Sequence, residues 1–285
     1  MQASFNTEVA EIPLEGIMVG NGATNWTYDV WPSFTATAAA MTTIPLDLWR
    51  DAEKYNCVAY FHGIRPATKS PECDAVAARL DTLTGKLNWY DLYRQNYDLS
   101  PLRGSDDRTG YTEVGGEPRT YKRGYTQREY TPFAEHIFNS EYSDVVLGDY
   151  VSYYMNQQST RDAFNIPDSV QTYEQCSSTL QYHVQDEASY WIYPILRNKY
   201  KLMFYSGDTD GAVSTYGSKQ WIKSLNWPIK ESWRPWYTSG QVSGYVEVYD
   251  GLDFVTVKGV GHMAPQWARQ AVTDMISAYV HDETF

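Results

Sequence analysis

One histidine in the sequence lies in a setting suited to proton transfer. His262 stands within VKGVGHMAPQ, between glycines at 259 and 261 and a proline, directly after a strand-like run. Glycines allow the backbone to turn sharply and allow neighbouring chain to approach closely. A histidine held on such a loop is positioned to act as a general base, which requires a carboxylate partner and a nucleophile.

An acidic turn supplies the candidate partner. DTDGAVS, residues 208–214, follows the apolar run KLMFYSG. In a parallel sheet, catalytic side chains lie in loops beyond the carboxyl ends of the strands, where a carboxylate can orient a histidine. Asp210 before His262 fits the order of nucleophile, acid and histidine in α/β-hydrolases. The alternative is that the Asp-x-Asp turn only caps the chain locally and that His262 is an ordinary loop residue.

The elements around these loops alternate between helices and strands. Helical spacing covers residues 46–61, 73–89, 148–166, 189–200, 217–227 and 265–280. Short strands are predicted at 14–22 and 201–207, with a hairpin around Asp250-Gly251. This succession predicts an α/β sheet with a helical excursion. Residues 100–132, rich in Gly, Arg, Asp and Thr, predict an exposed, protease-accessible loop or linker.

Composition excludes several classes of partner. The chain has 285 residues, 42% hydrophobic and 20% charged, with a net charge of -12 and a pI near 4.8. Nucleic acid and anionic membranes are therefore poor partners, because no basic face compensates this charge. No apolar run reaches the roughly 20 residues of a membrane helix, and the N-terminal residues do not read as a signal peptide.

Three cysteines, Cys57, Cys73 and Cys176, show no zinc-site spacing, and no metal is expected. Cys57 and Cys73 close a short loop and could bridge in an oxidising compartment. Cys176 is then left over, as a free buried thiol or with a partner outside the chain. Three unpaired cytosolic thiols are the alternative. Asn25 lies in an NWT sequon, a glycosylation pattern that also arises often by chance.

Several blocks of the sequence resemble the serine carboxypeptidase family. They are GIMVGNGATN, YMNQQSTRDAFNI, FYSGDTDGAVSTYGSKQWIKSLNW and PWYTSGQVSGYVEVYDGLDFVTVKGVGHMAP. The likeness runs from about Glu11 to Val280. It implies an α/β-hydrolase core, a mostly parallel sheet flanked by helices, with a helical insertion subdomain and a Ser-Asp-His triad. It also implies removal of C-terminal residues from peptides in a vacuolar, lysosomal or secreted setting, without a metal or organic cofactor.

The resemblance also implies roles for individual residues. Asp210, rather than Asp208, matches the triad acid and His262 the base. Met263 matches a residue that shapes the leaving-group side of the substrate pocket, with plain packing as the alternative. Cys57 and Cys73 match a disulfide within the insertion. Cys176 matches a cysteine that normally pairs far upstream.

The nucleophile is missing from this pattern. No Gly-x-Ser-x-Gly elbow occurs, and the nearest pentapeptide, GQVSG at 240–244, has the wrong spacing. By resemblance, residues 1–40 are the core segment after the nucleophile region, 41–147 the helical insertion with its linker, and 148–285 the C-terminal half of the core. We therefore expect the N-terminal part of the core to be absent from this chain.

Three functions are compatible with these observations. The first is a serine-type carboxypeptidase in which this chain supplies Asp210 and His262 and a partner chain or missing segment carries the serine. The second is a non-catalytic pseudoenzyme, or structural binding module, on the same scaffold. The third is an acyltransferase that uses the same triad.

Overall fold

A computed structural model describes residues 13–57, 70–94, 153–173 and 187–285, together with the backbone of three strands between 109 and 126. Internal contacts divide the chain into two units. The core unit comprises Met1–Leu80, Trp89–Asp91 and Gln185–Phe285, and the second unit comprises Asp81–Asn88 and Leu92–Val184. The three residues Trp89–Asp91 thus belong to the core unit although their chain neighbours on both sides do not. The predicted insertion at 41–147 stays a prediction.

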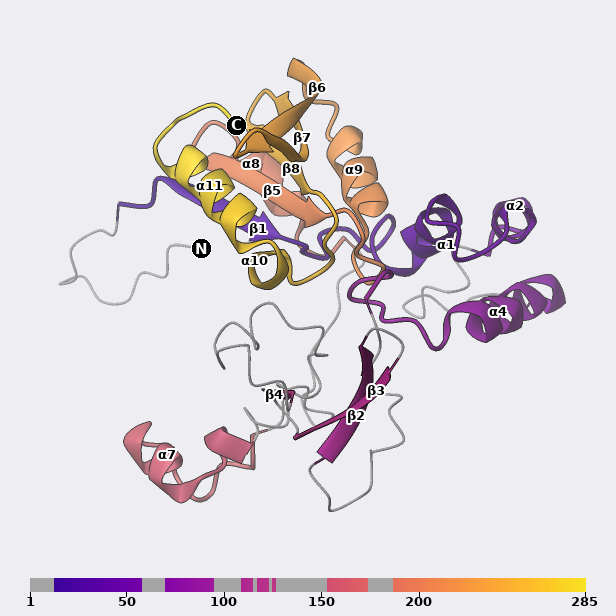
Figure 1. Cartoon of the computed structure of the whole chain (residues 1–285). Coiled ribbons are helices and arrows are strands. Elements are labelled where there is room, and N and C mark those ends of the chain that lie inside the picture. The colour runs from indigo at the N-terminus through magenta and orange to yellow at the C-terminus, as the bar shows by residue number, and fades with distance from the viewer. Residues whose placement is uncertain are drawn as a thin grey trace. The chain divides into compact units, whose positions relative to one another are not determined.

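A five-stranded sheet forms the centre of the core unit (Figure 1). Its spatial order is β1-β5-β8-β7-β6. The strands are β1 (Gly16–Gly20), β5 (Lys201–Gly207), β6 (Ile229–Thr238), β7 (Gln241–Tyr249) and β8 (Leu252–Val257). The predicted strands at 14–22 and 201–207 are confirmed. So is the hairpin, because Tyr249 pairs with Leu252 and Gly251 takes a positive φ of 108°.

Three neighbouring strands, β1, β5 and β8, run parallel. Their carboxyl ends meet at one edge of the sheet, since Gly20 lies opposite Tyr205 and Gly207 lies opposite Val257. The loops after these strands therefore converge at that edge, which is where α/β proteins place their functional groups.

Helices cover both faces of this sheet. Figure 1 shows α9 (Thr215–Ser224) and α11 (Arg269–Val280) on opposite sides of it. On the α9 side, Trp221 packs with Phe204 and Phe254, and all three side chains are buried. On the other side, Met275 of α11 packs with Met203 and other buried side chains of the sheet. The chain is thus an α/β protein, as predicted, stabilised by apolar burial on both faces.

Helix α11 also fixes the edge strand β1. The hydroxyl oxygen of Tyr279 lies 3.2 Å from the carbonyl oxygen of Ile17 and 2.6 Å from that of Lys201. The Tyr279 hydroxyl can come this close to β1 because residue 16 is a glycine. A Cβ on Gly16 would lie 2.6 Å from this hydroxyl. One side chain of the last helix thus bonds to two neighbouring strands.

The remaining helices are shorter than the sequence predicts, or were not predicted. They are α1 (Trp31–Ala40), α2 (Leu46–Lys54), α4 (Pro71–Thr84), α7 (Gln158–Ala163), the 3-10 turn η2 (Tyr190–Ile192), α8 (Tyr193–Leu196) and α10 (Ala264–Trp267). Helix α2 ends early because Asn56 takes a positive φ of 54°. The predicted helix at 265–280 is divided between α10 and α11 at Ala268, whose φ is -127°. Helix α1 was missed because WPSFTATAAA carries no apolar stripe of helical period.

One segment predicted as a loop contains strands. β2 (Thr109–Val114), β3 (Glu117–Lys122) and β4 (Tyr125–Thr126) form a three-stranded antiparallel sheet. The loop prediction for 100–132 is therefore wrong for these residues. Scarcity of Leu, Ile and Val suggested a loop, but Thr and Tyr, frequent here, also favour strands. The other residues of that range lie outside the described part of the chain.

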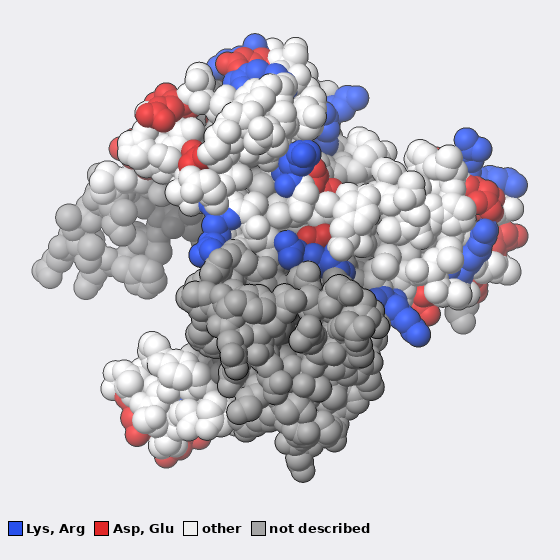
Figure 2. All heavy atoms as spheres, viewed as in Figure 1, with Lys and Arg blue, Asp and Glu red and all other residues white. Residues whose placement is uncertain are grey.

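Charged side chains are mixed by sign on the visible surface. Figure 2 shows Lys and Arg beside Asp and Glu over the described residues of this face. In the described part of the chain, no helix combines the length and apolar character needed to cross a bilayer.

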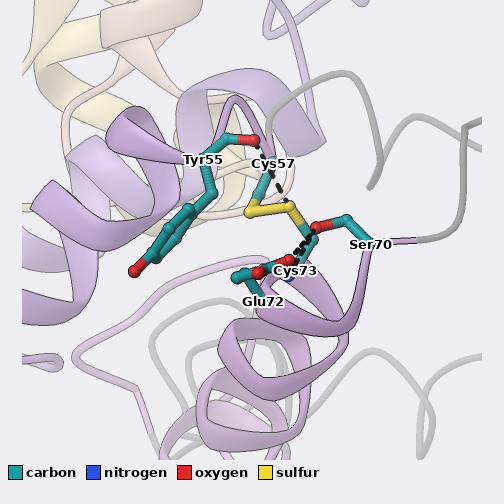
Figure 3. Close-up of a disulfide and its surroundings, with 5 residues drawn as sticks. All are labelled: Tyr55, Cys57, Ser70, Glu72 and Cys73. Atoms are coloured by element: carbon teal, nitrogen blue, oxygen red, sulfur yellow. Dashed lines mark hydrogen bonds between the residues drawn. A yellow bond between two sulfur atoms is a disulfide. The ribbon is translucent and has the colours of Figure 1, made fainter.

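A disulfide joins Cys57 and Cys73, as predicted, with 5.3 Å between the Cα atoms (Figure 3). Both sulfur-bearing side chains are fully buried. The Cys73 sulfur also lies 3.6 Å from the carbonyl oxygen of Tyr55. A disulfide sulfur carries no proton, so this is a packing contact rather than a hydrogen bond. The disulfide ties the chain just after α2 to the first turn of α4.

Removing this disulfide is expected to destabilise the fold. Closing a loop of this length is worth about 3 kcal/mol through the entropy of the unfolded chain. The double variant Cys57→Ser/Cys73→Ser should lose about that much in urea unfolding under oxidising conditions. Wild-type protein in excess dithiothreitol should match the variant. Equal stability of oxidised and reduced wild-type protein would contradict the expectation.

Candidate active site

The structure brings Asp210 and His262 together. His262 Nδ1 lies 2.8 Å from Asp210 Oδ2, although 52 residues separate them. The Asp210 side chain is fully buried, whereas the imidazole is 29% exposed. Asp208 is used differently, since its Oδ1 accepts a hydrogen bond of 2.6 Å from the Gly259 N–H. With Nδ1 directed at a carboxylate, Nε2 is the ring nitrogen suited to exchange a proton with a substrate or nucleophile.

The buried carboxylate of Asp210 receives hydrogen bonds on both oxygens. Oδ1 accepts from the N–H groups of Ala212 (2.8 Å) and Val213 (3.1 Å). Oδ2, besides facing His262, accepts from Asn21 Nδ2 at 2.7 Å. Burying an unpaired charge is costly, and these donors offset that cost. The acid loop (residues 207–214) thus holds its carboxylate in one orientation.

Asn21 is a member of the site that the sequence prediction missed. It follows β1 directly and takes a positive φ of 46°, which asparagine tolerates better than most residues. Its Oδ1 accepts from the Gly207 N–H at 3.3 Å while its Nδ2 donates to Asp210. The amide therefore joins the end of β1 to the acid loop. A signal was present, because Asn21 is a polar residue at a strand end, like Asp210.

The acid loop packs backbone to backbone against the end of β8 and the base loop (residues 258–263). The Asp208 N–H donates to the carbonyl oxygen of Val257 in β8 (3.0 Å), and the Thr209 N–H donates to that of Val260 in the base loop (3.1 Å). A Cβ on Gly207 would lie 2.2 Å from the carbonyl oxygen of Gly261, so only glycine fits there. Burial raises the pKa of Asp208, and its bond from Gly259 N–H opposes that shift.

A third segment, Trp89–Asp91, contacts both loops, and we call it the strap. The Gly211 N–H donates to Trp89 O (2.9 Å) and the His262 N–H donates to Tyr90 O (2.7 Å). The Tyr90 ring also lies 5.2 Å from the imidazole, tilted by 55°. The strap thus touches the loop of the acid and the loop of the base.

A sequence model of the serine carboxypeptidase family matches residues 1–282. The chain belongs to the serine carboxypeptidase family. It is similar to serine carboxypeptidase 1 of Hordeum vulgare, with 29% identity over 91% of this chain and 54% of that protein. Serine carboxypeptidase-like 40 of Arabidopsis thaliana shares 27% identity over 94% of this chain and 48% of that protein.

A solved structure supports the fold. The chain is similar to Kex1(delta)p, a prohormone-processing carboxypeptidase from Saccharomyces cerevisiae, with a TM-score of 0.56 and 15% identity. The match covers 94% of this chain and 55% of that one. Together with the family match, it identifies the α/β-hydrolase fold. The chain spans about half the length of the curated relatives it matches.

The other predicted site residues have different outcomes. Met263 is half-buried at the start of α10, and its carbonyl oxygen accepts a hydrogen bond from the Gln266 N–H (2.9 Å). These contacts concern its backbone, and a role of its side chain in substrate binding stays a prediction. Cys176 lies outside the described residues. Among the residues that are described, no group of three His, Cys, Asp or Glu side chains could hold a metal ion.

Asn25 lies in the turn after β1. It is 6% exposed, and its Oδ1 accepts a hydrogen bond of 3.0 Å from the Thr27 N–H. Glycosylation at this sequon stays a prediction.

A buried acid closes the turn that follows Asn21. Asp29 Oδ2 accepts from the N–H groups of Thr24 (2.7 Å) and Asn25 (2.9 Å), while Oδ1 has no partner among the described residues. Burial raises the pKa of Asp29 from 3.8 to about 7, against the opposing effect of the two N–H bonds. The carboxyl group is therefore more readily neutral in the folded protein than in the unfolded chain.

Removing the Asn21 amide is expected to destabilise the site. Asn21→Gly keeps the positive φ favourable but takes one donor from a buried carboxylate, a loss of about 2 kcal/mol. The difference in the free energy of unfolding between Asn21→Gly and wild type is measured by urea unfolding. A variant as stable as wild type would show that the bond from Asn21 to Asp210 contributes nothing to the fold.

Asp29 is expected to make stability depend on pH. Between pH 4 and 7 the folded state keeps the Asp29 proton and the unfolded state has lost it, so stability falls as pH rises through this window. The decline amounts to as much as about 4 kcal/mol. Asp29→Asn should lack this contribution, as measured by urea unfolding at several pH values. The exposed Asp168→Asn variant is the control and should keep the wild-type decline. A parallel decline in Asp29→Asn would exclude Asp29 as its source.

Proposed function

We propose that this chain supplies the acid and the base of a serine carboxypeptidase, which is active when a segment carrying the serine joins it. The observation that carries the proposal is the 2.8 Å contact between His262 Nδ1 and a buried Asp210 carboxylate with additional donors on both oxygens. Membership of the serine carboxypeptidase family supports it.

In the proposed reaction, the serine Oγ attacks the carbonyl carbon of the last peptide bond while its proton moves to His262 Nε2. The C–N bond then breaks as Nε2 passes that proton to the departing amine of the C-terminal residue. Water next attacks the ester, again giving its proton to Nε2, and the serine recovers a proton as the ester breaks. Asp210 accepts the Nδ1 hydrogen bond throughout and stabilises the imidazolium.

The edge of β1 is the proposed docking position for the serine-bearing segment. In the described residues β1 has a strand neighbour, β5, on one side only. A parallel strand added on the other side would end at the same sheet edge as Asn21 and the two catalytic loops. Met18 in the middle of β1 is 39% exposed, so a partner strand would also cover apolar surface. A disulfide from Cys176 to that segment is part of the same proposal.

A non-catalytic role is the second candidate, and one observation favours it. The sequence contains no Gly-x-Ser-x-Gly elbow, so the pair of Asp210 and His262 has no nucleophile of that type within it. On this account the chain is a binding module on a hydrolase scaffold. An acyltransferase would use the same pair with an acceptor alcohol in place of water.

An oxidising, acidic compartment is the proposed location. The Cys57–Cys73 disulfide supports an oxidising one, because such bonds are rare where thiols are kept reduced. The raised pKa of the buried Asp29 supports an acidic one, since the fold is then more stable below neutral pH. We therefore propose that the protein is vacuolar, lysosomal or secreted.

A fluorophosphonate probe tests the proposed function. The native protein, isolated with any associated chain, should be labelled on a serine, and mass spectrometry should locate that serine outside this chain's sequence. His262→Ala should reduce the labelling rate at least about 100-fold, because the base that activates the serine is gone. The exposed His281→Ala is the matched control and should label normally.

Three outcomes separate the candidates. Labelling together with release of C-terminal amino acids from peptides supports the carboxypeptidase. Labelling with transfer to an alcohol, and no release of amino acids, supports the acyltransferase. An intact, folded assembly without label would overturn catalysis and leave the binding module.

A further inference from the structure

We propose that Thr209 and Asp91 are positioning residues, whose hydrogen bond holds the strap against the acid loop and thereby fixes Asp210 relative to His262. The effect on catalysis rests on the proposed function, whereas the effect on His262 itself does not. Neither side chain is part of the acid–base pair.

Three consecutive side chains of the acid loop have three different partners. Asp208 Oδ1 accepts from Gly259 N–H in the base loop, and Asp210 Oδ2 faces His262 Nδ1. Between them, Thr209 Oγ1 donates to Asp91 Oδ1 in the strap at 2.8 Å. The sequence Asp-Thr-Asp therefore ties the acid loop to the base loop, to the strap and to the histidine. The bond of Thr209 leads to the strap, which also contacts the base loop at His262.

Burial makes the bond between Thr209 and Asp91 consequential. Thr209 is 4% exposed and Asp91 is 1% exposed, so water does not readily replace a lost partner there. A buried hydroxyl or carboxylate left without its hydrogen bond is unfavourable, and the surrounding backbone moves to relieve it. Thr209 directly precedes Asp210, so a shift of the backbone at Thr209 also moves Asp210.

The strap is itself anchored to helix α1. The Trp89 ring stacks on Phe34 of α1, with centroids 4.2 Å apart and planes within 4°, and Phe34 is 1% exposed. At Gly261 the strap lies so close that a Cβ would be 1.9 Å from Tyr90 O. The strap thus packs against helix α1 and is hydrogen-bonded to both loops. The Asp91 side chain links the strap to the acid loop through Thr209.

A matched pair of variants isolates the hydroxyl. Thr209→Val removes the donor and keeps the shape of the side chain, whereas Thr209→Ser keeps the donor and removes a methyl group. If positioning depends on the hydrogen bond, the valine variant alters the geometry of Asp210 and His262, and the serine variant restores it. If only packing at position 209 matters, serine disturbs the site as much as valine does.

The first readout needs no catalysis. The imidazole of His262 is followed by NMR in the native protein with 15N-labelled histidine, and its signals are assigned with the His262→Ala variant. Thr209→Val should move the His262 Nδ1–H signal, because the contact with the carboxylate changes. Thr209→Ser should match wild type.

The second readout is turnover. Because Thr209 and Asp91 touch no substrate in this account, Thr209→Val should lower kcat about tenfold and leave KM nearly unchanged, in keeping with a small misplacement of catalytic groups. Thr209→Ser should recover most of this loss. Should the valine variant fail to fold, Thr209→Ala removes the same hydroxyl without placing a methyl group against the Asp91 carboxylate.

The two proposals fail separately. Wild-type protein without serine labelling would remove the proposed function, while the NMR comparison would still decide the positioning role. Wild-type His262 signals in a folded Thr209→Val variant would overturn the positioning role even if thermal stability fell. Equal disturbance by valine and serine would overturn it as well.

Discussion

Burial of the Asp210 carboxylate is the constraint on which the site depends. A charge with no access to water needs hydrogen bonds on both oxygens, and here the donors come from three places. They are its own loop, the imidazole of His262 and the amide of Asn21. Asn21 lies 189 residues from Asp210 and His262 lies 52 residues from it. These groups meet only because β1, β5 and β8 are parallel and end at one edge.

The same constraint explains the glycines and the strap. Two loops and a third segment share a small volume beyond the strand ends, so their backbones must approach closely. Gly207 and Gly261 permit that approach, since a Cβ at either would overlap a carbonyl oxygen. The placement of Asp210 relative to His262 thus depends largely on main-chain contacts between these segments. Side chains such as Thr209 add to these contacts.

The sequence predicted the features that have a local signature. An apolar run before an acidic turn marked β5 and Asp210, and an Asp-Gly pair between alternating segments marked the hairpin of β7 and β8. The spacing of Cys57 and Cys73 left the disulfide open, and the resemblance to the family selected it. Asn21 had a local signal, as a polar residue at a strand end, but its partner lies 189 residues away and could not be predicted from that signal. The strap has no local signature, because it is defined by contacts between distant segments. The strands between 109 and 126 were missed because composition was interpreted without the strand preference of Thr and Tyr.

The hydroxyl of Tyr279 has a consequence for the two ends of the chain. It contacts β1 at Ile17, its second residue, and β5 at Lys201, its first, whereas Asn21 and the acid loop lie at the other ends of these strands. The C-terminal helix therefore holds β1, the strand directly before Asn21, in place. Loss of this contact would loosen β1 from the end opposite the site, without removing either member of the acid–base pair.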